Sequence, residues 1–274
     1  AGGYNRLTSI ISGREVEHED LVNFPNWLPL TLRVEDGEWL ELRRFEILAF
    51  RQALDLRRGL YERTVHVRDP HGRETRIVER RFVHMDEKHI AGQHVAVVAV
   101  NWSGRLTVRA FIDGGVVNAG VLRYRPFDGR HFEVRETASI DAETVLLDAE
   151  TTQSRIRVTQ AARLRVSING EPSRAERRTF AEPARIGQEI ALDLSAGDRV
   201  DVEKIVALYS SRDLAISDPR TEARDAVARA GRFDDLLRSH ALAWAQLWRR
   251  CDMSMDVEAE NNSSNDAQLI VRLH

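Results

Sequence analysis

Short segments in which apolar and polar residues alternate dominate the first 215 residues of the chain. Between Arg105 and Asp113 the small and aliphatic residues fall on every second position, which is typical of a strand with one buried face. Segment 94–100 is almost continuously apolar, as in a strand covered on both faces. Asn169-Gly170 marks a hairpin turn. Further strands are predicted at 76–83, 155–158, 163–168, 189–194 and 199–208.

After Ser217 the spacing of apolar residues changes from the alternation of strands to the period of a helix. Asp218 is suited to cap a helix whose first turn contains Pro219, and Gly231 is suited to end it. A second helix is predicted from an apolar stripe at i, i+3, i+4 and i+7 spacing. Its members are Phe233, Leu236, Leu237, His240, Trp244, Leu247, Trp248 and Cys251.

Many short strands without intervening helices predict a mainly β fold, a large antiparallel sandwich followed by α-helices. We assign residues 1–215 to the sandwich and 216–252 to the helices. Residues 253–274 begin as a polar, acidic loop and turn apolar again at 267–273. Because this apolar segment breaks off and the chain has no initial Met, we interpret the sequence as an excerpt of a longer polypeptide.

Charge and cysteine content argue against several classes of protein, among them nucleic-acid-binding and disulfide-bonded proteins. The 40 basic and 43 acidic residues are well mixed, which argues against a nucleic-acid partner. No apolar run is long enough to span a membrane, and the N-terminus is not a signal peptide. The lone Cys251 excludes an internal disulfide and favours a reducing cytoplasm; its place in the apolar stripe predicts a core position.

Histidines give no metal-binding pattern. His84, His89 and His94 are five residues apart, as are His66 and His71, whereas ligand pairs need i, i+4 on a helix or i, i+2 on a strand. We predict no metal site. We interpret His240, on the apolar stripe, as a buried structural histidine that holds a backbone carbonyl of a neighbouring segment.

No catalytic residue is predicted either. The chain has no Gly-x-Ser-x-Gly elbow and no phosphate-binding loop. An acidic cluster formed by Glu15, Glu17, Glu19 and Asp20 favours a solvated loop, with a loop projecting toward a sugar site as the alternative. Trp27, with Asn26 beside it, is a candidate for stacking on a sugar ring, although tryptophan is more often part of a core.

Five segments, in order, resemble glycoside hydrolase family 65, which includes maltose, trehalose and kojibiose phosphorylases and related hydrolases. They are Ala1-Gly2-Gly3-Tyr4-Asn5 with 19–30, Leu54–Gly59, Asn101–Gly104 with 113–118, His240–Trp244 with Trp248 and Asp252, and Gln268–His274. The resemblance spans nearly the whole chain.

The resemblance implies an N-terminal β super-sandwich of the galactose-mutarotase type, linker helices, and an (α/α)₆ barrel that carries the catalytic glutamate and binds phosphate. Residues 253–274 would be the loop and the first helix of that barrel. The implied mechanism is inverting, with inorganic phosphate or water as the attacking group. The implied partners are the missing barrel, an α-glucoside disaccharide and a second copy in a homodimer; no cofactor is implied.

Two other functions stay open. A stand-alone carbohydrate-binding module would need exposed aromatic residues on one sheet face. An aldose epimerase would need an acid and a base that converge in the concave cleft of the sheet, for which His84, His94 and Glu79 are available.

Overall fold

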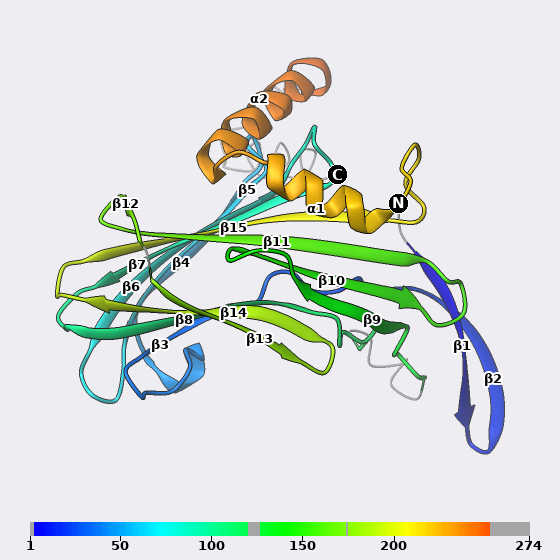
Figure 1. The fold of residues 1–274 in the computed structure, drawn as a ribbon, viewed down its shortest axis with the longest axis horizontal. Helices are drawn as coiled ribbons and strands as arrows, with labels where there is room; N and C mark the ends of the chain where they lie inside the picture. The colour runs from blue at the N-terminus through cyan, green and yellow to red at the C-terminus, as the bar shows by residue number, and fades with distance from the viewer. Residues whose placement is uncertain (1–2, 120–126, 174, 253–274) are drawn as a thin grey trace, which may run out of the picture.

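The computed structural model describes residues 3–119, 127–173 and 175–252. Its strands form three antiparallel sheets, and two helices follow them (Figure 1). The strands are β1 (Tyr4–Ile11), β2 (Arg14–Leu21), β3 (Leu30–Val34), β4 (Glu46–Asp55), β5 (Leu60–Arg68), β6 (Glu74–Val83), β7 (Ile90–Ala99), β8 (Gly104–Asp113), β9 (Phe132–Ser139), β10 (Thr144–Thr151), β11 (Arg157–Ile168), β12 (Glu171–Pro172), β13 (Glu176–Glu182), β14 (Arg185–Leu194) and β15 (Arg199–Ser210).

The large sheet has the order β4-β5-β6-β7-β15-β11-β10-β9, with β12 paired to β11. The four-stranded small sheet has the order β13-β14-β8-β3. This arrangement confirms the predicted mainly β, antiparallel sandwich. It also confirms that the strand around 94–100 is covered on both faces, since nearly every residue of β7 is buried.

Two apolar layers sandwich the large sheet. On the face that we call inner, Val97, Val202 and Leu164 pack against Val108 and Ile190 of the small sheet. On the opposite, outer face, a second set of apolar side chains packs under the helices. Because side chains alternate along a strand, the two faces of β7 and β15 are filled by neighbouring residues.

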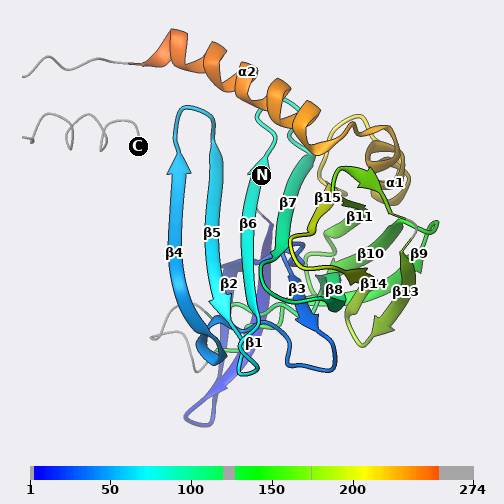
Figure 2. The same ribbon diagram turned by 90° about the vertical axis from the view of Figure 1, so that its left-hand side faces the viewer.

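The helices α1 (Pro219–Arg229) and α2 (Phe233–Cys251) cover the outer face (Figures 1 and 2). As predicted, Asp218 accepts a hydrogen bond from the Thr221 amide and Pro219 opens the first helix. The first helix ends at Arg229, before the predicted Gly231. Glu203 of β15 accepts a hydrogen bond from the Phe233 amide at 2.7 Å, which places a carboxylate at the positive end of α2.

The predicted core position of Cys251 is wrong, because its side chain is exposed. Figure 2 shows the C-terminal end of α2 reaching past the outermost strand β4. The Trp248 indole N–H, one turn earlier, still donates to the carbonyls of Leu56 and Arg57 at the β4–β5 turn. The last residue of the stripe therefore has no sheet beneath it.

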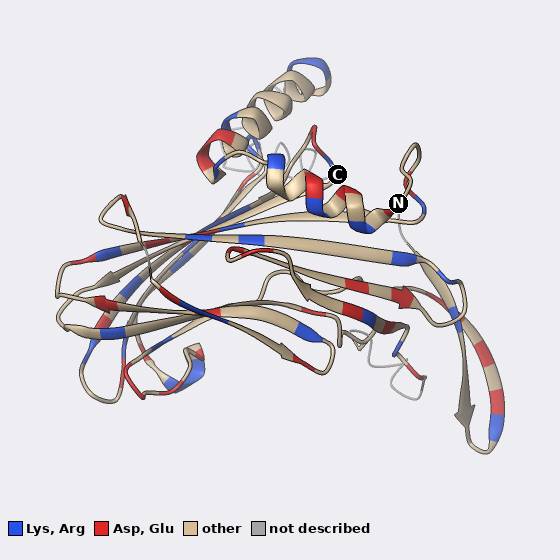
Figure 3. Cartoon of the chain, in the orientation of Figure 1, with Lys and Arg blue, Asp and Glu red and all other residues tan. Residues whose placement is uncertain are grey.

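The acidic cluster lies on a strand and not in a loop. β1 and β2 form a two-stranded hairpin apart from both larger sheets, and acidic residues follow one another along β2 (Figure 3). The expected loop is wrong because the strand pairs fully with β1 while its glutamates face solvent. The two strands expected at 155–158 and 163–168 are one strand, β11, which ends at the predicted Asn169-Gly170 turn into β12.

Candidate functional site

Asn26 and Trp27 lie in the segment that leads into β3. The Asn26 backbone forms an isolated bridge with Asp113 at the end of β8, and its side-chain oxygen accepts a hydrogen bond from the Leu28 amide. Trp27 is half-buried against the apolar cluster around Ile112 and Leu147. The segment forms one wall of an open depression that Val116, Val117 and Leu208 complete.

A buried lysine fixes this segment from below. Lys204, on the inner face of β15, donates to the carbonyl oxygens of Trp27, of Pro29 at 3.2 Å and of Phe111 at 2.8 Å. The side chain is 1% exposed, and burial lowers the pKa of its ammonium to about 7. All three N–H donors are used, so Lys204 joins the large sheet to β8 and to the segment that carries Trp27.

Sequence reasoning missed Lys204, although a signal exists. Lys204 is spaced by two residues from Val202 and Val206, and by four from Val200, so it lies on the same inner face of β15 as these valines. A single lysine at an apolar position of a buried strand needs hydrogen-bond acceptors for its ammonium, and carbonyls at a strand end supply them.

The candidate acid and bases of an epimerase do not converge. Glu79 of β6 pairs with Val95 of β7, and Arg80 pairs with His94. Neighbouring residues point to opposite faces, so Glu79 lies on the inner face while His94 lies on the outer face, with its ring near Phe233 of α2. Strand alternation thus separates the carboxylate from the imidazole by the thickness of the sheet.

Glu79 is held by two cations on the inner face. Its carboxylate is 2.8 Å from the Arg63 guanidinium and 3.4 Å from that of Arg81, and it accepts a hydrogen bond from Gln93 at 2.9 Å. The residue is 2% exposed. The Glu79 carboxylate therefore joins β5, β6 and β7 through its arginine and glutamine partners.

The imidazole of His94 is engaged as well. Its Nε2 lies 3.0 Å from Asp201, which also pairs with Arg199. Burial acts to raise the pKa of the Asp201 carboxyl, but the hydrogen bonds from His94 and Arg199 outweigh it and hold this pKa well below its ordinary value. The group ties β7 to β15 on the outer face.

His84 and His240 fasten α2 to the sheet. His84 Nδ1 accepts hydrogen bonds from the Asp86 and Glu87 amides, which leaves Nε2 to bond Ser239 of α2 at 2.8 Å. His240 is fully buried; its Nδ1 accepts from the Met85 amide at 3.0 Å and its Nε2 faces the Gly59 carbonyl at 3.3 Å. The prediction that His240 holds a backbone carbonyl is confirmed.

Two histidines converge on Asp20 without forming a metal site. The Asp20 carboxylate lies 3.4 Å from His18 Nε2 and 3.3 Å from His131 Nε2. Asn5 donates through Nδ2 to Nδ1 of His131, since its Oδ1 is fixed by the amides of 153 and 154. His131 Nε2 therefore carries the proton and faces the Asp20 carboxylate. In the described ranges, no group of three such side chains is arranged to hold a metal ion.

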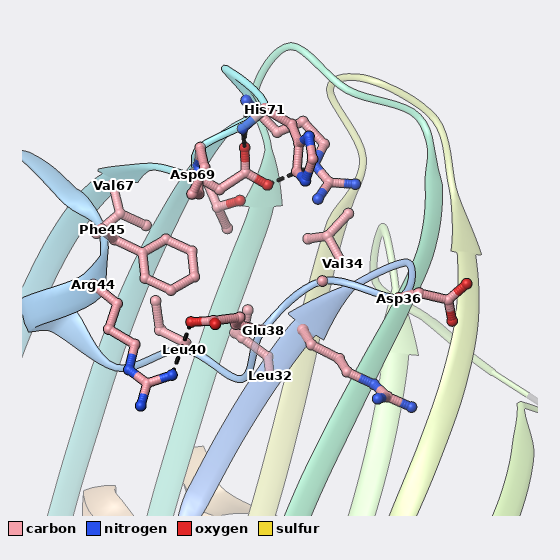
Figure 4. A pocket seen from close by; sticks show the side chains of 15 residues that line it. Leu32, Val34, Asp36, Glu38, Leu40, Arg44, Phe45, Val67, Asp69 and His71 are labelled. Atoms are coloured by element: carbon pink, nitrogen blue, oxygen red, sulfur yellow. Dashed lines mark hydrogen bonds and ion pairs between the residues drawn. The ribbon is translucent and has the colours of Figure 1, made fainter.

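A cavity of about 210 Å³ lies between β3 and the β5–β6 turn (Figure 4). Leu32, Val34, Leu40, Phe45 and Val67 give it an apolar lining, and two ion pairs, Asp69 with Arg73 and Glu38 with Arg44, lie at its rim. Burial acts to raise the pKa of Asp69, but hydrogen bonds from Arg73 and His71 hold it below its ordinary value. Asp69 and Glu38 each have an arginine partner at the rim, and Arg33, Asp36 and His71 also line the cavity.

His66, His71 and His89 lie apart from one another. His66 contacts Glu74 on the outer face, His71 lies at the cavity rim, and His89 stacks on Tyr209.

No helix of the described residues is long and apolar enough to cross a membrane.

The chain is similar in sequence to several longer proteins. The chain is 37% identical over its whole length to an uncharacterised glycosyl hydrolase of Mycobacterium tuberculosis, of which it covers 20%. It is 28% identical to a kojibiose phosphorylase of Caldanaerobacter subterraneus, over 93% of this chain and 33% of that protein. It is also 28% identical to a trehalose 6-phosphate phosphorylase of Lactococcus lactis, again over a third (33%) of the relative.

A solved structure has the same fold. A putative kojibiose phosphorylase from the human microbiome superposes with a TM-score of 0.77 at 17% sequence identity. The superposition covers 98% of this chain and 34% of that one. The family model for the N-terminal domain of glycosyl hydrolase family 65 matches residues 1–247. This chain therefore belongs to glycosyl hydrolase family 65, whose N-terminal domain it represents.

Proposed function

We propose that this chain is the non-catalytic N-terminal part of an enzyme that cleaves α-glucosidic disaccharides such as kojibiose, trehalose or maltose. The observation that carries the proposal is the match of residues 1–247 to the family's N-terminal domain, while the chain spans only 20% to 33% of the relatives named above. The reacting groups belong to a helical barrel, and residues 253–274 would lead into it.

The contacts of the described side chains support a non-catalytic role for this domain. Glu79 is neutralised by arginines, and His94 is separated from it by the sheet. The buried cation Lys204 is committed to three carbonyls. Each of these groups holds strands in place, and Glu79 and His94 do not meet on one face of the sheet.

The barrel also decides between phosphate and water as the attacking group. Inorganic phosphate is then a co-substrate, and the domain itself needs no cofactor. We expect the protein to work in the cytoplasm, where its lone Cys251 stays reduced.

The test is an assay of the purified 274-residue chain with kojibiose, trehalose and maltose, each with and without inorganic phosphate. We expect no release of glucose or glucose 1-phosphate, whereas a longer polypeptide that includes the barrel turns over at least one sugar. Turnover by the 274-residue chain alone would contradict the proposal.

A second function, sugar binding by Asn26 and Trp27, is favoured by the open depression beside them. Calorimetric titration with the same disaccharides tests it. Binding that is lost in Trp27→Ala, and kept in a variant of the half-buried Trp39, would establish a carbohydrate-binding surface.

A further inference from the structure

The cavity between β3 and the β5–β6 turn is large for the interior of a single domain. Native interiors contain few voids larger than a water molecule, because their side chains pack closely. This cavity measures about 210 Å³. An apolar cavity of roughly 150 Å³ is enough to bind benzene. The space therefore holds one aromatic ring with a small substituent.

Apolar side chains from separate segments form the walls. Leu32 and Val34 point inward from β3, and Val67 points inward from the end of β5. Leu40 and Phe45 also line the space, and Figure 4 shows the Phe45 ring across from Val34. A sugar has hydroxyl groups all around its ring, which these side chains cannot bond. The lining therefore selects an apolar body over a sugar.

Hydrogen bonds hold two sides of the cavity in place. The Leu40 amide donates to the Leu32 carbonyl at 2.8 Å, which fixes the segment after β3 against that strand. On the side of the β5–β6 turn, Asp69 accepts hydrogen bonds from the amides of His71 at 2.8 Å and Arg73 at 2.9 Å. A site whose walls are already fixed loses little conformational entropy on binding, so the cavity is pre-organised for a ligand.

The charges around the cavity cancel. Among the described residues that line it, three carboxylates balance three arginines: Asp36, Glu38, Asp69, Arg33, Arg44 and Arg73. Glu38 pairs with Arg44 at 3.0 Å, and Asp69 pairs with Arg73 at 2.6 Å. A charged ligand would lose its hydration here without meeting an excess of opposite charge. The lining therefore favours a neutral molecule.

One hydroxyl of the lining has no acceptor for its proton. Thr75 lies on β6 opposite Val67 of β5, lines the cavity and is 5% exposed. Its Oγ1 accepts a hydrogen bond from Trp102 Nε1 at 3.1 Å, and none of the described residues accepts the Thr75 proton. Because a buried donor without an acceptor is costly, a ligand atom that accepts this proton is favoured.

We propose that this cavity binds a neutral, compact apolar molecule of the size of one aromatic ring, which carries a single hydrogen-bond acceptor. The apolar side chains enclose the ring, and Thr75 donates its proton to the acceptor. The site shares no lining residue with the depression beside Trp27, so it is separate from the sugar-binding surface considered above. For a ligand of about eight non-hydrogen atoms we expect a dissociation constant on the order of 1 mM.

Titration of the 274-residue chain with p-cresol, followed through its methyl NMR signals, tests the proposal. We expect saturable shifts of the Val34 and Val67 methyl signals with half-saturation near about 1 mM, and no shifts with glucose. Leu40→Trp fills the cavity and should abolish the shifts. Leu30→Trp is the matched control and should keep them, because Leu30 packs against the same apolar cluster without lining the cavity.

Thr75→Val tests the hydrogen bond by itself. This change should weaken the binding of p-cresol about fivefold and should leave the binding of toluene, which has no acceptor, unchanged. Circular dichroism verifies that each variant is folded; if Leu40→Trp is not, the wild-type titration and Thr75→Val decide. The proposal is overturned by a wild type without saturable shifts up to about 10 mM p-cresol, by shifts that persist in folded Leu40→Trp, or by equal effects of Thr75→Val on both ligands.

Discussion

The interior around β15 and the margin at β4 use polar groups in opposite ways. At β15, Lys204, Glu203 and nearby Arg163 each find several partners within the chain. At β4, the backbone edge and Arg51 find none among the described residues. Charged groups inside this domain therefore hold its strands and helices together, whereas Arg51 at the β4 edge faces solvent.

The largest effect on stability is expected in the interior, from Arg163→Ala. Arg163 donates to the carbonyls of Val227 at 2.8 Å and of Ala230 and Gly231 at 2.9 Å, at the C-terminal end of α1. Its loss leaves these buried acceptors unpaired, so the free energy of unfolding should fall by about 3 to 5 kcal/mol. Urea unfolding measures the change, and Arg51→Ala at the margin is the control, with a change below about 0.5 kcal/mol. Equal effects would erase the distinction between the two regions.

The buried ammonium predicts a stability that rises with pH. The pKa of Lys204 is lowered from 10.5 to about 7, so between these pH values the unfolded chain binds more protons than the folded one. Stability therefore increases through this window, by roughly 3 kcal/mol up to about pH 9.5.

Direct titration of the two lysines by NMR tests whether the pKa of Lys204 is lowered. Lys88 and Lys204 are the only lysines of the sequence, so the Cε resonances can be assigned with Lys88→Arg. We expect the Lys204 resonance to titrate near pH 7. Titration of that resonance near 10.5 would show that the ammonium is not confined as described.

A third interior group, His240, should make the stability of the domain depend on pH on the acid side. Burial lowers the pKa of His240, and a proton on Nδ1 would face the Met85 N–H. The unfolded chain therefore binds more protons below about pH 6.5, so stability is lost as the pH falls below that value. His240→Leu should cost about 2 kcal/mol at neutral pH and should flatten the acid slope. Identical slopes for variant and wild type would exclude His240 as their source.

The smallest effect is expected at the margin. Leu54→Lys should change the free energy of unfolding by less than about 0.5 kcal/mol, because the side chain is already 56% exposed. Chemical unfolding measures this change. A loss of several kcal/mol would mean that Leu54 belongs to the core of a single chain.

The sequence predicts the interior better than the margin. The strands at 76–83, 94–100 and 105–113 were evident because burial enforces an apolar face on them. β4 was not predicted, since an edge strand with solvent on one side of its apolar row has no strict alternation. The hairpin of β1 and β2 was missed for a related reason, because its charges are compatible with a loop.

Side-chain partners were predicted only where they are local or follow from one helix face. The Asp218 cap and the position of His240 follow from neighbouring residues or from a period of 3.6. The contacts of Lys204 join strands that are distant in sequence, and those of Glu79 depend on the register of three consecutive strands, so a single sequence does not reveal them. The resemblance supplied the family, and residues of the fold then explained why the candidate acid and bases fail to meet.

A rate measurement on the 274-residue chain tests most directly whether this domain is non-catalytic. At high protein concentration, with each disaccharide and with inorganic phosphate present, we expect no product above the protein-free background. A measurable rate that disappears in Glu79→Gln would contradict it, since that carboxylate would then be a reacting group.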